Sequence, residues 1–175
     1  MLPMTSTYAL RPVVPEDAAA VLDAFTSAPD MDRQGPVVDE ASAGEYVSWL
    51  LEESRRSVAV THQDVMVGLV AATVDTANRS AWVFYWMHGQ HRGRGVTARA
   101  VATVADHLLG SGLERLELGH RVNNPASGAV AEAAGFVQEG RERGKFLVDG
   151  ERVDVLTYGR LVDDPWPQVE PLPGL

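Results

Sequence analysis

One stretch of the chain decides its fold, Tyr85–Leu109, which reads YWMHGQHRGRGVTARAVATVADHLL. It begins with an apolar, aromatic run typical of a β-strand and then turns through Gly93 and Gly95. A helix is expected from Val96, because apolar residues recur from there at helical spacing. The first turn of a helix has free N–H groups, and the helix dipole adds roughly half a positive charge there. The turn therefore predicts a site for a phosphate or another anion.

Eleven elements are expected around this turn, in the order β-α-α-β-β-β-α-β-α-β-β. Their expected ranges are 8–11, 15–27, 41–55, 57–61, 65–74, 81–87, 96–109, 113–120, 127–134, 146–148 and 152–158. The three successive strands before the glycine turn indicate an antiparallel meander, and Asp149-Gly150 is typical of a type I′ hairpin turn. We therefore expect an α/β (α+β) fold whose sheet is mixed, mostly antiparallel and seven-stranded, flanked by about four helices.

The composition limits what kind of protein this is. The chain has 175 residues, a net charge of −9 and no cysteine. Its length suits one domain, which we expect at residues 1–162, followed by a proline-rich tail at 163–175. The acidic charge argues against a nucleic-acid partner. The chain contains no run of about 18 apolar residues, so a membrane span is not expected. The N-terminus shows no signal-peptide pattern, so a cytoplasmic protein is expected.

Three interpretations of the glycine turn compete. Gly93, Gly95 and Ala98 match the dinucleotide-binding pattern G-x-G-x-x-G/A. Glu117, 24 residues after the first of these, stands where an acid would bind a ribose. That fold needs a parallel sheet with further βα units, whereas here a meander precedes the turn and a hairpin follows. A second interpretation is a tight strand-to-helix connection that binds nothing.

The third interpretation depends on four motifs in sequence. Gln90–Gly95 fits the pattern Q/R-x-x-G-x-G/A, and Asn124 with Ser127 fits N-x-x-S. Residues 135–140 read GFVQEG, and residues 149–158 read DGERVDVLTY. In this order the motifs resemble the GNAT acetyltransferases over nearly the whole chain, and within that family the RimJ/RimL-like branch.

The resemblance implies acetyl-coenzyme A as co-substrate and no metal. In the family, main-chain N–H groups of the glycine turn bind the pyrophosphate, and the pantetheine arm lies in a central splay between the fourth and fifth strands. The positions that the resemblance assigns to coenzyme A are Met87, His88, Arg92, Gly93, Arg94, Gly95, Val96, Thr97, Asn124 and Ser127. Shaping the turn is an alternative role for Asn124, and capping its helix is one for Ser127.

The reaction that the resemblance implies is direct attack of a neutral amine on the thioester. It needs a neutral amine, an oxyanion donor and a proton for the leaving thiolate. The candidates for these roles are Glu117, His120, Ser127 and Tyr158. Glu117 and His120 face opposite sides of one strand, so only one of them can face the substrate directly. A structural histidine and a salt-bridged glutamate are the alternatives, and Ser127 or Tyr158 would protonate the thiolate.

The acceptor is expected to be a primary amine, either a protein N-terminus or a small molecule. An α-amine has a pKa of about 7.7–8.0 and reacts readily near neutral pH, whereas a lysine amine, at about 10.4, needs a base or burial. Trp82 stands near a position where this branch often has a glutamate, which argues against a simple transfer of ribosomal-protein specificity. The run Arg141–Lys145 is expected to be a solvated loop that borders the acceptor site.

Two further hypotheses follow. A non-catalytic module that binds acyl-coenzyme A as a sensor or scaffold is the alternative function. A homodimer is a hypothesis because the N-terminal edge strand and the proline-rich tail offer surfaces to a second copy.

Overall fold

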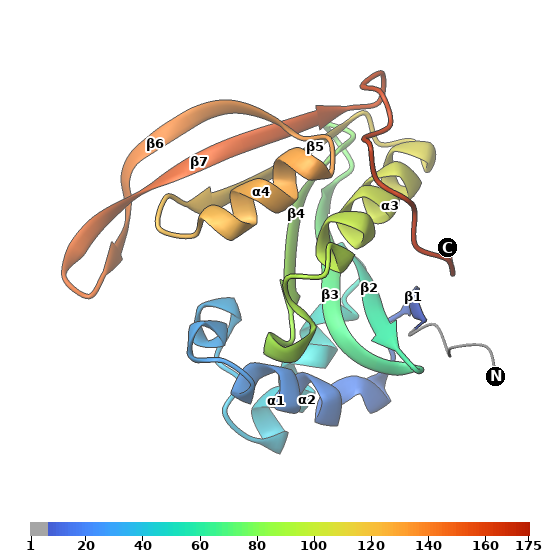
Figure 1. Cartoon of the computed structure of the whole chain (residues 1–175), viewed down its shortest axis with the longest axis vertical. Helices are drawn as coiled ribbons and strands as arrows, with labels where there is room; N and C mark the ends of the chain where they lie inside the picture. The colour runs from blue at the N-terminus through green and yellow to red at the C-terminus, as the bar shows by residue number, and fades with distance from the viewer. Residues whose placement is uncertain (1–6) are drawn as a thin grey trace.

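The computed structural model describes residues 7–175 as an open seven-stranded sheet with the strand order β1-β2-β3-β4-β5-β7-β6 (Figure 1). The strands are β1 Tyr8–Pro12, β2 Arg55–His62, β3 Val65–Asp75, β4 Ser80–Met87, β5 Arg115–Arg121, β6 Val137–Val148 and β7 Glu151–Leu161. The helices are α1 Ala18–Thr26, α2 Glu40–Leu50, α3 Val96–Gly110 and α4 Pro125–Ala133, with 3-10 turns η1 Pro15–Asp17, η2 Pro29–Gln34 and η3 Gly89–His91. The predicted fold class and element order are confirmed. Residues 1–6, part of the segment in which we sought a signal peptide, lie outside the described residues.

The sheet consists of two antiparallel halves joined by one parallel pair. Strands β1 to β4 form the meander, and β5, β7 and β6 form the second half. Strands β4 and β5 pair only where Ser80–Trp82 meets Arg115–Glu117 and separate beyond that point. The predicted splay between the fourth and fifth strands is therefore confirmed. It opens toward the end of β4, where the glycine turn begins (Figure 1).

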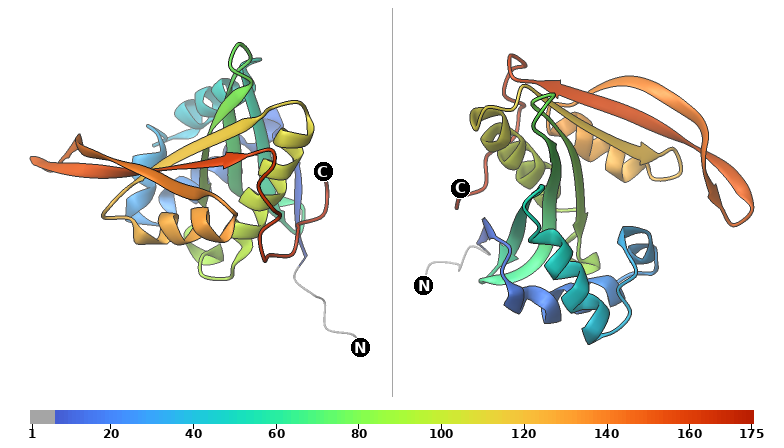
Figure 2. Two further views of the ribbon diagram at one scale, coloured as in Figure 1. Left: turned by 90° about the horizontal axis from the view of Figure 1, so that it is seen from above. Right: turned by 180° about the vertical axis from the view of Figure 1, so that it is seen from behind.

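The core lies on both faces of the sheet, with α3 and α4 on one face and α1 and α2 on the other (Figure 2). Alternation along β4 separates the two: Val83 and Met87 pack toward α3, and Trp86 packs toward α1 and α2. The indole N–H of Trp86 donates to the Tyr46 hydroxyl at 3.0 Å. Trp82 shares the face of Trp86, yet 43% of it is exposed against 3% for Trp86. Helices α1 and α2 do not cover Trp82, and its side chain lines a pocket instead.

Two element boundaries differ from the prediction by five residues or more. Helix α2 ends at Leu50, five residues before the expected end. Arg55 already belongs to β2, where its guanidinium stacks at 3.8 Å on the Trp49 ring. The second difference is the predicted solvated loop Arg141–Lys145, which lies inside β6 instead. Two ion pairs form along the hairpin: Arg141 pairs with Asp154 at 2.6 Å and Lys145 with Glu142 at 2.7 Å.

The proline-rich segment 163–175 has no helix or strand and lies along α3, finishing beside β1 (Figure 1). Leu172 is buried, at 3% exposure. The Leu10 amide donates to the Pro173 carbonyl at 2.8 Å, and Arg99 Nε donates to the Glu170 carbonyl at 2.9 Å. The outer edge of β1, which we expected to be open to a second copy, is therefore partly covered by the chain itself. None of the helices in residues 7–175 combines the length and apolar character needed to cross a membrane.

Candidate active site

The glycine turn has the backbone that the sequence predicted. Gly93 and Gly95 both have φ +72°, a region that residues with a side chain adopt rarely, and Gly95 is the N-cap of α3. A Cβ atom at either glycine would meet nothing within 4 Å. The glycines are thus required by the backbone conformation, and the space next to them is open. The first N–H groups of α3 have no partner within the helix, so the turn can bind an anion.

Side chains from the turn hold it against the N-terminal half of the protein. Arg92 donates to both carboxylate oxygens of Asp30 at 2.9 Å and to the Met87 carbonyl at 3.0 Å. The buried His88 places Nε2 3.1 Å from Asp23 in α1, while its Nδ1 accepts from the Gln90 amide. The His88 side chain is therefore directed into the protein. Its role here is to support the turn.

A cavity of about 190 Å³ lies between the end of β4 and the N-terminal part of α4, where the splay between β4 and β5 opens. Six of the ten residues predicted to bind coenzyme A line it. They are Met87, Arg92, Gly93, Thr97, Asn124 and Ser127. Its other lining residues are Asp30, Gln34, Tyr85, Trp86, Ala126 and Val130. The structure thus brings the strand end, the glycine turn and the N-terminus of α4 together around one space.

Asn124, rather than Ser127, caps helix α4. Asn124 is the N-cap residue, and its side-chain oxygen accepts from the Ser127 amide at 3.4 Å. The Ser127 hydroxyl lies instead 2.9 Å from the Tyr85 hydroxyl, which is also 2.9 Å from the Ser127 carbonyl. A carbonyl only accepts, so Tyr85 donates its proton there and the Ser127 hydroxyl donates to the Tyr85 oxygen. Burial raises the pKa of Tyr85 to about 12, which keeps it protonated at neutral pH.

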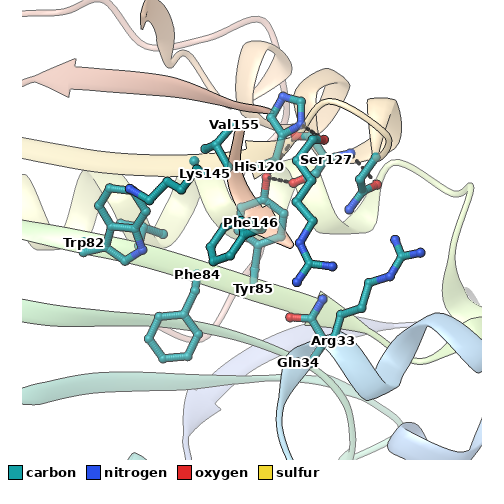
Figure 3. Close-up of a pocket in the computed structure, with 14 residues that line it drawn as sticks. Arg33, Gln34, Trp82, Phe84, Tyr85, His120, Ser127, Lys145, Phe146 and Val155 are labelled. Carbon is teal, nitrogen blue, oxygen red and sulfur yellow. Dashed lines mark hydrogen bonds between the residues drawn. The ribbon is translucent and has the colours of Figure 1, made fainter. Parts of the chain in front are cut away.

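A larger pocket, of about 270 Å³, lies on the other side of Tyr85 and Ser127 (Figure 3). Trp82, Phe84 and Phe146 form apolar walls, and His120 lies beside the N-terminus of α4. The residues common to both cavities are Gln34, Tyr85, Asn124 and Ser127. The two cavities therefore share a wall made of polar side chains.

His120 and Tyr158 form a buried pair next to this wall. His120 Nδ1 lies 2.8 Å from the Arg121 carbonyl, so Nδ1 carries the proton in the neutral ring and Nε2 has the lone pair. Nε2 lies 3.3 Å from the Tyr158 hydroxyl and close to Gly128, where a Cβ would stand 2.8 Å away. Burial, together with Glu132, raises the pKa of Tyr158 above its ordinary value. Three of the four predicted catalytic residues, His120, Ser127 and Tyr158, thus gather at one helix N-terminus.

Glu117, the fourth candidate, lies apart from them. It is on the opposite side of β5 from His120, as the strand period predicted. Its carboxylate accepts from Arg115 Nε at 2.8 Å, and Arg115 also pairs with Glu139. The geometry favours the alternative of a salt-bridged glutamate for this residue.

Sequence reasoning missed several residues of the site. Tyr85 lies in the aromatic strand β4, between Trp82 and Trp86, and was not assigned a role from the sequence. Period-two alternation places Tyr85 on the face that α3 and α4 cover, and a buried tyrosine needs a hydrogen-bond partner, so its role could have been found. Other missed pocket residues come from η2, from the middle of β4, from the end of β5 and from β6. Among them are Arg33, Gln34, Phe84, Arg121 and Phe146.

Residues 8–137 match the family model described as acetyltransferase (GNAT) domain. The chain therefore belongs to the GNAT acetyltransferase family, as its motifs suggested. Within residues 7–175 only β4 and β5 run parallel, so the dinucleotide-binding interpretation of the turn is wrong.

The chain is similar in sequence to two bacterial proteins and in fold to a solved structure. A ribosomal-protein-serine acetyltransferase of Escherichia coli (strain K12) is 33% identical over 104 residues, which span 58% of each chain. The putative ribosomal N-acetyltransferase YdaF of Bacillus subtilis (strain 168) is 27% identical over 135 residues, 69% of this chain and 72% of that protein. The solved structure of RimL, a ribosomal L7/L12 alpha-N-protein acetyltransferase in complex with coenzyme A, has a TM-score of 0.80. It is 20% identical, with 93% of this chain and 98% of that one covered.

Proposed function

We propose that this protein is an N-acetyltransferase that moves the acetyl group of acetyl-coenzyme A to a primary amine. The observation that carries the proposal is the shared polar wall. One cavity lies in the splay beside the glycine turn, the other opens to solvent between aromatic side chains, and they meet at Tyr85 and Ser127. Two substrates bound one on each side would meet at that wall.

The first cavity suits coenzyme A. The open space beside Gly93 and Gly95 admits a pyrophosphate to the N–H groups of α3. Beyond Trp82 the main chain of β4 has no partner in β5, which leaves room for an extended arm between the strands. Structural neighbours of the same fold contain coenzyme A or acetyl-coenzyme A, which supports this assignment.

The residues of the shared wall then have definite tasks. The thioester of acetyl-coenzyme A supplies the acetyl group, and its sulfur leaves as a thiolate that needs a proton. The Ser127 hydroxyl can deliver one once it turns from the Tyr85 oxygen toward the sulfur, and a proton from solvent then restores the hydroxyl. The Nε2 lone pair of His120 is the acceptor for the amine proton, directly or through Tyr158. Glu117 is bound to Arg115 on the opposite side of β5 and takes no part in these proton transfers.

The acceptor amine comes from one of two sources. Relatives named for ribosomal proteins support a protein N-terminus in a cytoplasmic setting. Neighbours of the same fold named spermidine N-acetyltransferase and microcin C7 self-immunity acetyltransferase support a small-molecule amine. Both sources present the primary amine that the wall requires.

Release of free thiol tests the proposal. The protein is mixed with acetyl-coenzyme A and either an N-terminal-serine peptide or spermidine, and thiol is followed with time. Ser127→Ala should lower kcat about a hundredfold while the affinity for acetyl-coenzyme A stays within a factor of about two. Ser48→Ala, an exposed serine of α2, is the control and should change neither.

The same assay separates the alternative function. A sensor or scaffold module would bind acetyl-coenzyme A in calorimetry and release no thiol with any amine. If the wild type and Ser127→Ala have equal kcat, the protein is still an enzyme, but Ser127 has no part in the mechanism.

A further inference from the structure

The charged side chains that line the larger pocket are all cationic. Arg33 comes from η2, Arg121 from the end of β5 and Lys145 from β6. The chain as a whole has a net charge of −9, so three cations around one pocket run against its composition. In Figure 3, Arg33 and Gln34 lie to one side of Tyr85 and Ser127, and Trp82 and Lys145 to the other. The pocket therefore has a cationic end near η2 and an aromatic end near Trp82.

Arg33 and Arg121 are available to a ligand. Neither forms an ion pair within residues 7–175, whereas Lys145 is bound to the Glu142 carboxylate at 2.7 Å. The Arg121 guanidinium lies 5.0 Å over the Phe146 ring, which supports it without neutralising its charge.

The acids nearby line a neighbouring hollow and form no ion pair with the two arginines. Arg33 and Arg121 also border a shallower hollow together with Asp30, Asp32 and Asp149. Asp30 is bound by Arg92, and the other two form no ion pair with either pocket arginine. Within the larger pocket itself no aspartate or glutamate of residues 7–175 is among the lining residues, so the charges that face its interior are positive.

Arg33 and Arg121 differ from the arginines that are bound to carboxylates elsewhere in the protein. Arg11 pairs with Asp17, Arg92 with Asp30 and Arg115 with Glu139, each at the place where it packs. A guanidinium offers a planar fork of donors that matches a carboxylate or a phosphate. Two such forks beside a polar wall are complementary to an anionic group on the molecule that brings the amine.

We propose that the acceptor of this enzyme carries a carboxylate or phosphate beyond its amine, and that Arg33 and Arg121 bind this group. The inference rests on the proposed function, because the amine must lie at Tyr85, Ser127 and His120 for the anion to reach η2. The aromatic end of the pocket then receives an apolar part of the same molecule. The anionic group belongs either to an acidic residue close to a protein N-terminus or to a small amine.

The experiment compares acceptors that differ only in charge. Three peptides begin with serine and are identical except for aspartate, asparagine or lysine at positions two to four. O-phosphotyramine and tyramine form a second pair, with the same amine and ring. We expect the aspartate peptide or the phosphate-bearing amine to exceed its basic or neutral partner in kcat/KM by roughly tenfold, as for two partly exposed charge pairs acting together.

The variants are Arg33→Gln, Arg121→Gln and the double variant, with Arg143→Gln as control. Arg143 is an exposed cation of β6 that does not line the pocket, and its loss removes one positive charge, as each single variant does. The double variant should bring the charged and uncharged acceptors within about twofold of each other, while Arg143→Gln keeps the preference. The affinity for acetyl-coenzyme A should be the same in all four, because none of these side chains lines the coenzyme A cavity.

Each outcome decides something. A preference confined to the peptides assigns a protein acceptor, and one confined to phosphotyramine assigns a small molecule. Equal rates for all acceptors, or a preference for lysine, overturn the inference and leave the proposed function standing. Calorimetric binding of an acidic acceptor to the coenzyme A complex, without acetyl transfer, supports the anion site and contradicts the proposed function. Absence of any charge preference in both transfer and binding overturns the inference.

Discussion

Gly128 sets the position of His120 by having no side chain. It follows Ser127 in the first turn of α4, and a Cβ there would stand 2.8 Å from His120 Nε2 and 3.4 Å from the Tyr158 hydroxyl. The imidazole therefore occupies space that any other residue would fill. Because its Nδ1 is fixed by the Arg121 carbonyl, the ring cannot turn away without losing that hydrogen bond.

Gly128→Ala tests this arrangement at the scale of one methyl group. Displacement of His120 should lower kcat by about tenfold or more, since general acid–base catalysis contributes factors of this order. Acetyl-coenzyme A should bind with unchanged affinity in calorimetry. Gly44→Ala is the matched control, because it lies in α2 with nothing within 4 Å of its added Cβ. A kcat equal to the wild type in Gly128→Ala would contradict the role given to His120.

At the same scale, the sequence predicted some site residues and missed others for identifiable reasons. Motifs and strand period pointed to His120, Ser127 and Tyr158, which the structure brings together, and their catalytic roles remain predictions. Arg33 was missed because η2 lies in a stretch of prolines and acids that has no helical or strand periodicity, so the sequence does not predict its conformation. Strand alternation places Trp82 and Trp86 on one face, but the sequence does not say how far the helices on that face extend.

At the scale of elements, the glycine turn joins two functions in one segment. Its backbone places the N-terminus of α3 beside the splay, while Arg92 and His88 anchor it to η2 and α1. The charge at the helix N-terminus is available because Gly95 is a cap without a side chain.

Substitution of Gly95 separates charge from shape. Asp and Asn both tolerate the left-handed backbone and both cap helices well, so Gly95→Asp and Gly95→Asn should fold alike. The carboxylate of Gly95→Asp should weaken acetyl-coenzyme A binding about tenfold more than the amide of Gly95→Asn, by repulsion of the pyrophosphate. Calorimetry measures both affinities and thermal melting checks the fold. Equal affinities in the two variants would show that no anion lies at the cap.

A second link between elements is a histidine cluster behind the turn. The His91 ring lies 5.1 Å from that of His62 and 5.6 Å from that of His88, and the Tyr8 hydroxyl lies 2.8 Å from His91 Nδ1. Burial, then His62, His88 and Arg94, lower the pKa of His91 below its ordinary value of 6.5. The neutral ring is the form that this packing accepts.

The sign of the pH effect follows from that direction. Below about pH 6.5 the unfolded chain binds a proton at His91 more readily than the folded protein does, so the free energy of unfolding falls as pH falls. Urea denaturation between pH 8 and pH 5.5 measures the slope, which His91→Gln should reduce. His107→Gln, an exposed histidine of α3, should leave it unchanged. A steeper slope in His91→Gln would reverse the assignment.

Element boundaries show why prediction from the sequence stops where it does. The strands of the meander were placed within two residues because alternation is local. The run Arg141–Lys145 was assigned to a loop because alternating charges look solvated, and only pairing with β7 makes it a strand. Gly144, with φ +58°, accommodates a bulge there and its amide donates to Asp154 at 2.6 Å.

At the scale of the whole molecule, the segment 163–175 closes the N-terminal edge of the sheet. Gly174 approaches Leu10 so closely that a Cβ would stand 2.0 Å from the Leu10 carbonyl oxygen. The division into a domain at 1–162 and a tail remains a prediction, and the homodimer remains a hypothesis. What the contacts show is that this segment packs on α3 and β1.

Gly174→Ala should therefore detach the last residues from β1. We expect the free energy of unfolding to fall by about 1–3 kcal/mol, as for an overpacked site, and the Leu10 amide to exchange its hydrogen faster. Gly150→Ala is the control: its φ is +82° but its Cβ would meet nothing within 4 Å, so it carries only the backbone cost of about 1 kcal/mol. Unchanged exchange at Leu10 would show that the contact is dispensable.

The splay between β4 and β5 has a consequence for the lifetime of the protein. Strands β4 and β5 pair at three residue positions. The main-chain N–H and C=O groups of β4 beyond Trp82 therefore have no partner in β5 and can bind a ligand. A ligand that binds there and not to the unfolded chain adds about 2.7 kcal/mol to the free energy of unfolding when present at 100 times its Kd. Resistance to heat and to proteases then rises and falls with the supply of that ligand.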